Sequence, residues 1–263
     1  MNASTGHTVM VSAHRSGAEL DISAENRRPT LIGSAEAAYD FVEFDVQRCK
    51  DGTFVLHHDN YVVINGQQRP IGAVDYDELT AVQSEIVTLN EALDILRGKS
   101  KAHVDLKFTS PPELYDDPAS TYEVEAASLV IEKMGVANCI ITTLEDPSVL
   151  TVRRWAEHRY PALLVGLSLG RSAEELSPTA TLSLRLREIF PERRLRTCRA
   201  NLIVANKQLA KLRLARLAQK MGLPLLVWTV DEEEELRAWL SDSRAWLVTT
   251  NFPRRALAIR ESL

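Results

Sequence analysis

The chain of 263 residues is poor in cysteine, with only Cys49, Cys139 and Cys198. Three cysteines so far apart exclude a disulfide framework and the closely spaced ligand pairs of a structural zinc site. Cys139 and Cys198 adjoin apolar runs, so we expect both to be small core or edge residues. A hydrophobic core must therefore stabilise the fold, and the chain length and 45% hydrophobic content are ample for one.

Long apolar runs and an excess of positive charge are also missing. No run of about 18 apolar residues exists, so we expect no membrane insertion. The opening MNASTGHTVMVSAHR lacks a basic start followed by an apolar run, so we expect no secretory signal and a cytoplasmic location. The formal net charge of −5 provides no general basic field for nucleic acid.

Apolar runs typical of strands alternate with helical patterns through eight units. We expect strands at VMVSA (directly before His14), 41–46, 102–106, 139–144, 162–169, 200–205, 224–230 and 245–250. We expect helices at 31–40, after Thr88, at 122–134, 147–158, 179–190 and 207–221, after Glu232, and at the end of the chain. Thr88 and Glu91 predict a capping box at the start of the second of these helices, and Gly222 is expected to end the helix at 207–221. The segments 15–30, 60–86, 110–121 and 171–178 are expected to be loops.

This alternation predicts a parallel sheet with crossover helices. No glycine-rich dinucleotide fingerprint follows the first strand, which argues against an open nucleotide-binding sheet. The length fits one (β/α)8 TIM barrel, which typically needs about 250 residues. We therefore expect residues 1–263 to form a single α/β barrel domain, with the carboxyl ends of all its strands on one face.

Two carboxylates stand out on the second expected strand. Glu43 and Asp45 lie two residues apart in FVEFDV, so both side chains point to one face. Carboxylates among Phe and Val side chains are costly unless a cation joins them, and a hard divalent cation is the simplest candidate. A lone Glu-x-Asp is also common at a solvated strand edge or in an ion pair.

Three polar dipeptides follow or flank neighbouring strands, namely His14-Arg15, Glu25-Asn26 and His58-Asp59. Histidine transfers protons near neutral pH, and arginine binds phosphate oxygens. Each dipeptide alone is ordinary in loops, and each histidine could be a buried structural residue. Together within residues 11–60 they indicate phosphoester cleavage. His57 points to the opposite strand face from His58 and is not expected to be catalytic.

On these motifs the sequence resembles the glycerophosphodiester phosphodiesterase family, within the phosphatidylinositol-phospholipase-C-like phosphodiesterase barrels. The family begins with His-Arg-Gly, Glu-Asn-Thr, Glu-x-Asp and an Asp-Gly stretch leading to His-Asp. The corresponding residues here are His14-Arg15-Ser16, Glu25-Asn26-Arg27, Glu43-Phe44-Asp45, Asp51-Gly52 and His58-Asp59. Further matches at Val87–Leu89, Val104–Lys107, Val227–Asp231 and Thr249–Pro253 extend the resemblance over nearly the whole chain.

The resemblance implies a metal-dependent hydrolase of small-molecule glycerophosphodiesters, active in glycerol or lipid metabolism. One divalent cation, Mg²⁺ or Ca²⁺, would be held by Glu43, Asp45 and Asp105. The catalytic acid–base pair would be His14 and His58, with Asp59 holding His58 or Arg15. Substrate-binding residues would be Arg15 and Lys107 at the phosphate, Trp228 at the alcohol unless it is a core residue, and Glu25 as a ligand or an orienting group.

The sequence departs from the family pattern at four positions. Ser16 replaces Gly, Arg27 replaces Thr, and Asn251 replaces Asp in the last motif. Asp105 stands where the family usually has Glu and is one methylene shorter. It would therefore bind the cation directly or through water, or else pair with Lys107 or Arg15.

The expected products are glycerol 3-phosphate and an alcohol, with either water or the glycerol hydroxyl as the attacking group. A lysophospholipase D or sphingomyelinase D-like lipid phosphodiesterase is a related alternative, although no apolar groove is evident in the sequence. A non-catalytic phosphate-binding barrel is the alternative from another class. The alcohol, the choice of metal and the oligomeric state have no readable signal.

Overall fold

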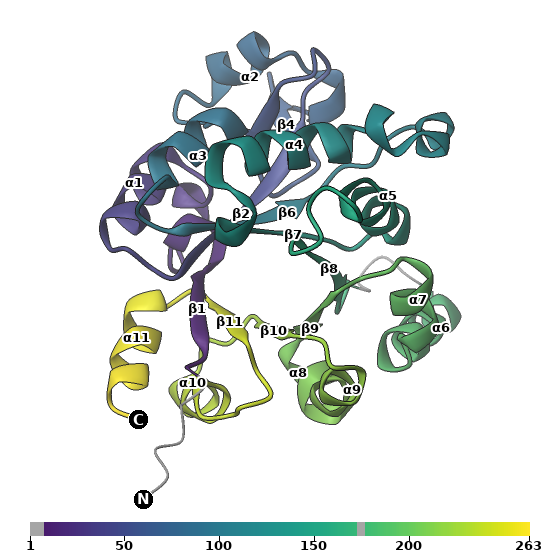
Figure 1. Ribbon diagram of the computed structural model, residues 1–263. Coiled ribbons are helices and arrows are strands. Elements are labelled where there is room, and N and C mark those ends of the chain that lie inside the picture. The colour runs from purple at the N-terminus through teal and green to yellow at the C-terminus, as the bar shows by residue number, and fades with distance from the viewer. Residues whose placement is uncertain (1–7, 173–176) are drawn as a thin grey trace, which may run out of the picture.

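The computed structural model describes residues 8–172 and 177–263, and its centre is a closed ring of parallel strands (Figure 1). The strands follow the order β1-β11-β10-β9-β8-β7-β6-β2, and β1 also pairs with β2, which closes the ring. Their bounds are β1 Met10–Ala13, β2 Phe41–Arg48, β6 Lys101–Leu106, β7 Cys139–Thr143, β8 Leu164–Leu169, β9 Leu202–Asn206, β10 Leu225–Trp228 and β11 Leu247–Thr250. The predicted (β/α)8 barrel is confirmed.

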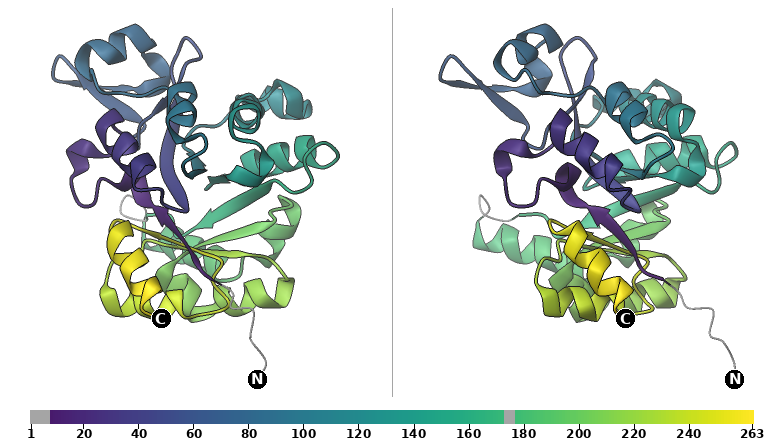
Figure 2. Two further views of the ribbon diagram at one scale, coloured as in Figure 1. Left: turned by 60° about the vertical axis from the view of Figure 1, so that its left-hand side comes forward. Right: turned by 90° about the vertical axis from the view of Figure 1, so that its left-hand side faces the viewer.

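Helices follow the strands and surround the ring (Figures 1 and 2). Their bounds are α1 Arg28–Glu36, α3 Leu89–Leu96, α4 Tyr122–Met134, α5 Asp146–Ala156, α6 Pro178–Ile189, α7 Glu192–Thr197, α8 Lys207–Leu209, a π-turn Ala210–Leu214, α9 Ala215–Met221, α10 Glu233–Leu240 and α11 Pro253–Glu261. The predicted helix at 122–134 coincides with α4, whereas α1 begins earlier than predicted. No helix in the described part of the chain is both long and apolar enough to cross a membrane.

Two hydrophobic layers lie inside and outside the ring. The inner layer fills the amino-terminal part of the barrel with Phe41, Ile140, Leu202, Val204, Leu226 and Leu247. Gly166 makes this packing possible, because a Cβ there would lie 2.5 Å from Cγ2 of Val204. The outer layer joins the other strand faces to the helices. The barrel is therefore packed below, and only its carboxyl end can hold a site.

Predicted helix boundaries are confirmed where a specific cap was visible in the sequence. Thr88 accepts a hydrogen bond from the Glu91 backbone at 3.2 Å, and the Thr88 backbone donates to Glu91 Oε2 at 2.9 Å. This is the predicted capping box of α3. At the end of α9, Gly222 adopts φ 66°, a left-handed conformation that glycine accepts without strain.

The prediction of a loop at 60–86 is wrong. The segment contains the hairpin β4 Tyr61–Ile64 and β5 Gln67–Pro70, and the helix α2 Tyr76–Val82, which project from the ring (Figure 1). Asn65 and Gly66 form the hairpin turn with φ values of 51° and 77°, a geometry typical of Asn-Gly. Buried residues of this segment form a small core of their own with β3 Phe54–Leu56, which pairs antiparallel to β2.

The segment 110–121 was predicted to lack structure but contains two 3₁₀ helices, Pro112–Asp116 and Pro118–Ser120. Glu123, fully buried at the start of α4, anchors this segment. Its carboxylate accepts hydrogen bonds from the Tyr115 and Ser148 hydroxyls at 2.5 and 2.7 Å. Of the predicted loop 171–178, residues 173–176 lie outside the described part of the chain.

Replacing Thr88 with Ala is expected to lower the free energy of unfolding by about 1 kcal/mol, because the first turn of α3 loses its cap. Urea denaturation followed by circular dichroism measures the change. Thr197→Ala, at the exposed end of α7, is the control and should leave the value unchanged. Equal losses in both variants would contradict a specific contribution from the capping box.

Candidate active site

A cavity of about 470 Å³ opens at the carboxyl ends of the strands. Polar side chains from β2, β6 and the segments after β1, β3 and β6 line it, together with Leu144, Gly170, Arg171 and Trp228. Most of the residues singled out in the sequence lie on this cavity, namely His14, Arg15, Glu43, Asp45, His58, Asp105, Lys107 and Trp228. Glu25 does not line it and instead accepts a hydrogen bond from Arg15 Nη1 at 2.7 Å.

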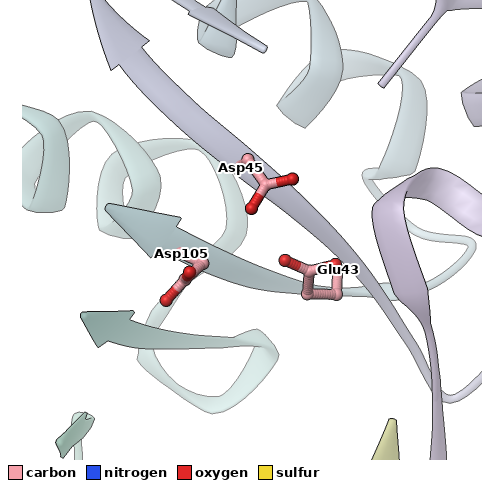
Figure 3. A group of neighbouring side chains, drawn as sticks. All are labelled: Glu43, Asp45 and Asp105. Carbon is pink, nitrogen blue, oxygen red and sulfur yellow. The ribbon is translucent and has the colours of Figure 1, made fainter. Parts of the chain in front are cut away.

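The three carboxylates meet because of strand register. Glu43 and Asp45 are two residues apart on β2 and share its inward face, and Asp105 on β6 lies directly beside Asp45. Their side chains point toward one space inside the barrel mouth (Figure 3). One oxygen of each lies within 4.8 Å of the others, and Glu43 and Asp45 are 4% and 1% exposed. Three hard oxygen donors at this spacing fit a divalent cation.

The electrostatics of the carboxylates are unequal. Burial, together with the Asp45 and Asp105 carboxylates, raises the pKa of Glu43 well above its ordinary value. Burial also disfavours ionisation of Asp45, but Lys107 and nearby cations outweigh it and lower the Asp45 pKa. Lys107 Nζ lies 3.0 Å from Asp45 and 2.5 Å from Asp105. Lys107 therefore compensates two of the three carboxylates, which leaves Glu43 without a cationic partner of its own.

The same carboxylates keep Lys107 in its charged form. Burial favours its neutral form, but Asp105 and Asp45 outweigh this and raise the Lys107 pKa. The ammonium group therefore stays charged inside the cavity and remains available to an anionic ligand.

Arg15 is fixed from both its backbone and its side chain. The Arg15 backbone N–H donates to Glu43 Oε2 at 2.6 Å, and its Nε lies 3.7 Å from Asp45 Oδ2. Arg15 and the next residue, Ser16, have φ values of 45° and 65°, in the left-handed region that favours glycine. This backbone turn aims the Arg15 N–H at Glu43, and it gives a physical reason for the family's Gly where Ser16 stands.

His14 is held in one tautomer by Asn251, which belongs to the motif Thr249–Pro253. Its Nδ1 lies 2.8 Å from Asn251 Oδ1, while Asn251 Nδ2 donates to Asp231 Oδ2 at 2.8 Å. Because the Asn251 amide nitrogen already faces Asp231, its oxygen faces His14, so Nδ1 carries the proton. Burial, followed by the charge of Arg15, lowers the His14 pKa, so its Nε2 is free to accept a proton at neutral pH.

His58 has a different partner. Its Nδ1 lies 2.9 Å from Asp59 Oδ1, and its side chain is 38% exposed. The chain around it is anchored by Gln47, whose amide donates to the Asp59 carbonyl at 3.0 Å. His57 also contacts the Asp59 carbonyl and is not among the residues lining the cavity.

Several supporting residues were missed or given no role in the sequence analysis. Asn26 holds Asp45 with hydrogen bonds of 2.9 Å from its amide and 3.3 Å to its carbonyl oxygen. Asn251 and Asp231 were noted only as parts of motifs, and Gln47, His103 and Thr142 were not singled out. Gln47, His103 and Thr142 share a signal, because each lies on the inward face of a barrel strand. Asn26 lies in the loop before α1, where no such pattern exists.

Comparison with known proteins agrees with this geometry. The model of the "Glycerophosphoryl diester phosphodiesterase family" matches residues 14–255. A search of curated proteins found no match. A glycerophosphodiester phosphodiesterase from Parabacteroides distasonis is similar over 98% of this chain and 99% of its own, at 22% identity and a TM-score of 0.73.

Two further solved structures support the same barrel fold. A phosphodiesterase from Oleispira antarctica, solved with the product sn-glycerol-3-phosphate, shares 18% identity over 97% of both chains, with a TM-score of 0.68. A glycerophosphodiester phosphodiesterase from Thermotoga maritima shares 18% identity over 97% of this chain and 99% of its own, with a TM-score of 0.65. The family match spans nearly the whole chain. The protein therefore belongs to the glycerophosphoryl diester phosphodiesterase family and is an enzyme of the phosphodiesterase class.

Proposed function

We propose that the protein, as one barrel domain, hydrolyses glycerophosphodiesters to sn-glycerol 3-phosphate and an alcohol. The observation that carries the proposal is the convergence of His14, His58, three carboxylates and the cations Arg15 and Lys107 on one cavity. The product complex of the Oleispira antarctica relative supports the choice of glycerol 3-phosphate as a product. A small phosphodiester is compatible with a cavity of about 470 Å³.

Glu43, Asp45 and Asp105 would hold one Mg²⁺ or Ca²⁺. The fit rests on their buried oxygen-only donor set and on the raised pKa of Glu43, which marks a carboxylate cluster short of positive charge. When bound, the cation would supply positive charge beside the phosphate and stabilise the negative charge of the transition state. The Asp105 carboxylate is paired with Lys107 in the described structure. Its role as a metal ligand would use this same carboxylate.

Arg15 and Lys107 would bind the nonbridging phosphate oxygens. Both line the cavity, and both are held by carboxylates that leave part of each cationic group facing it. Glu25 would act through Arg15, because its carboxylate holds the guanidinium rather than facing the cavity. Trp228 would form the wall for the alcohol, beside Gly170.

His14 and His58 would divide proton transfer between them. His14 donates Nδ1–H to Asn251 and has a lowered pKa, so its neutral Nε2 is suited to remove a proton from the attacking hydroxyl. His58 Nδ1 lies 2.9 Å from Asp59 Oδ1, so Asp59 holds the orientation of the ring. His58 would protonate the departing alkoxide.

The reaction is expected to release glycerol 3-phosphate from glycerophosphocholine or glycerophosphoethanolamine in the presence of Mg²⁺ or Ca²⁺, and none in EDTA. The carboxylates need a cation to bring the phosphate close, so Glu43→Ala should abolish release. An enzyme-coupled assay for glycerol 3-phosphate measures it. Release from lysophospholipid or sphingolipid substrates alone would support a lipid phosphodiesterase instead.

His58→Ala and His14→Ala are each expected to lower kcat by about 10²- to 10⁴-fold, because each removes a proton-transfer group. Both variants should still bind Mg²⁺, since neither histidine belongs to the carboxylate cluster. Steady-state kinetics and calorimetric Mg²⁺ titration check the two effects. His57→Ala is the matched control, and normal turnover in His58→Ala would show that the acid role is wrong.

Glu43→Gln is expected to stabilise the metal-free protein at neutral pH and to remove its stabilisation by Mg²⁺. Folding raises the pKa of Glu43, so the native state loses stability as pH rises from the ordinary carboxyl pKa through the folded one. Gln carries no such cost and still accepts the Arg15 N–H. In the unsubstituted protein, Mg²⁺ at about 100 times its Kd should add about 2.7 kcal/mol.

Thermal unfolding with EDTA and with Mg²⁺ measures both effects of this substitution. Glu36→Gln, on the exposed surface of α1, is the control and should alter neither. A metal-free Glu43→Gln protein that melts below the unsubstituted protein would contradict the proposed charge imbalance.

A further inference from the structure

A third histidine, His103, lies inside the barrel beside Glu43 in the β2–β6 pairing and also lines the cavity. His103 is on β6 two residues before Asp105, so both side chains face the interior, and His103 is 3% exposed. Its Nδ1 lies 3.2 Å from Ser12 Oγ, and its Nε2 lies 3.2 Å from Thr142 Oγ1. Thr142 Oγ1 in turn donates to Asp105 Oδ1 at 2.6 Å. These side chains form one hydrogen-bonded chain from β1 to β7.

The hydrogen bonds of these side chains all run in one direction. Thr142 has a single hydroxyl proton and gives it to the Asp105 carboxylate, so its oxygen can only accept from His103. His103 therefore carries its proton on Nε2, and Nδ1 accepts from the Ser12 hydroxyl. Burial, and next the charge of His14, lowers the pKa of His103 to about 3, in keeping with a neutral ring. Every bond in the chain thus donates toward Asp105.

The two oxygens of Asp105 consequently have separate tasks. Oδ1 accepts the Thr142 hydroxyl, while Oδ2 lies 2.5 Å from Lys107 Nζ. The Thr142 bond fixes the carboxylate plane, because Asp105 and Thr142 are direct neighbours across the β6–β7 pairing. Within the described part of the chain, Oδ2 has no neutral hydrogen-bond partner and is paired with Lys107 alone.

We propose that His103 and Thr142 are positioning residues that orient Asp105, so that it offers Oδ2 alone to the divalent cation. The inference rests on the metal site of the proposed function. Hydrogen-bonded partners of ligating carboxylates set metal affinity, and losing one typically costs about 10- to 100-fold. The direct neighbour of His103 on β7 is Ile140, a member of the apolar inner layer, so a hydrophobic residue would fill the space of His103 at lower desolvation cost.

The chain supplies a matched control at the same level of the barrel. Thr249 on β11 is the direct neighbour of Ser12 on β1, and it is 1% exposed. Its Oγ1 has no hydrogen-bond partner in the described part of the chain. Thr249→Val therefore removes a buried interior hydroxyl without touching Asp105, whereas Thr142→Val makes the same chemical change within the hydrogen-bonded chain.

The test is calorimetric titration of the full-length protein and its variants with Mg²⁺ alone. Thr142→Val and His103→Leu should each raise the Kd by about 10- to 100-fold, because Asp105 loses its orientation. Thr142→Ser, which keeps the hydroxyl, should restore most of the affinity, and Thr249→Val should bind as the unsubstituted protein does. The double variant Thr142→Val/His103→Leu should bind Mg²⁺ no more weakly than Thr142→Val, since the hydrogen-bonded residues act as one unit.

Two results would overturn the proposal. Unchanged Mg²⁺ affinity in Thr142→Val and His103→Leu, together with lost turnover, would mean that His103 acts on the substrate. An equal loss of affinity in Thr249→Val would mean that only barrel packing matters. If His103→Leu does not fold, as judged by cooperative melting, the nearly isosteric Thr142→Val decides alone.

Mg²⁺ and Ca²⁺ binding by the unsubstituted protein and by Glu43→Gln separates this inference from the proposed function. If the unsubstituted protein binds no Mg²⁺ and no Ca²⁺, the metal site itself is wrong and the inference falls with it. If it binds Mg²⁺ and Glu43→Gln abolishes binding, while Thr142→Val binds normally, only the positioning role is refuted.

Discussion

The structure of this enzyme depends on placing three carboxylates inside the mouth of an apolar barrel. Buried charges are tolerated only when paired or hydrogen-bonded. Lys107 and Arg15 compensate Asp45, Asn26 donates to it, and the Arg15 backbone donates to Glu43. The compensation is incomplete at Glu43, where a divalent cation would complete it. The left-handed turn after β1 and the short segment before α1 both serve this charge balance.

The barrel turns sequence spacing into three-dimensional proximity. Glu43 and Asp45 are neighbours in sequence, but Asp105 joins them only because β6 pairs with β2 in the register that sets it beside Asp45. The same closure brings Asn251, after β11, against His14, after β1. The packed inner layer keeps these positions rigid, which a site built from loops alone would lack.

His14 and His58 differ in their hydrogen-bond partners. Both are half-buried, but His14 is held by a neutral amide and His58 by a carboxylate. In the proposed function, His14 would act as the base and His58 as the acid, so two residues of one type would divide proton transfer between them.

The sequence alone determined the barrel, the capping box of α3 and the strand face shared by Glu43 and Asp45, because these follow from local period and local hydrogen bonds. The prediction of a loop at 60–86 was wrong, although the dipeptide Asn65-Gly66 is typical of a hairpin turn. The link from Asp231 through Asn251 to His14, the withdrawal of Glu25 from the cavity and the link from His103 to Asp105 were decided by tertiary structure. These contacts depend on strand register and ring closure, which no local pattern specifies.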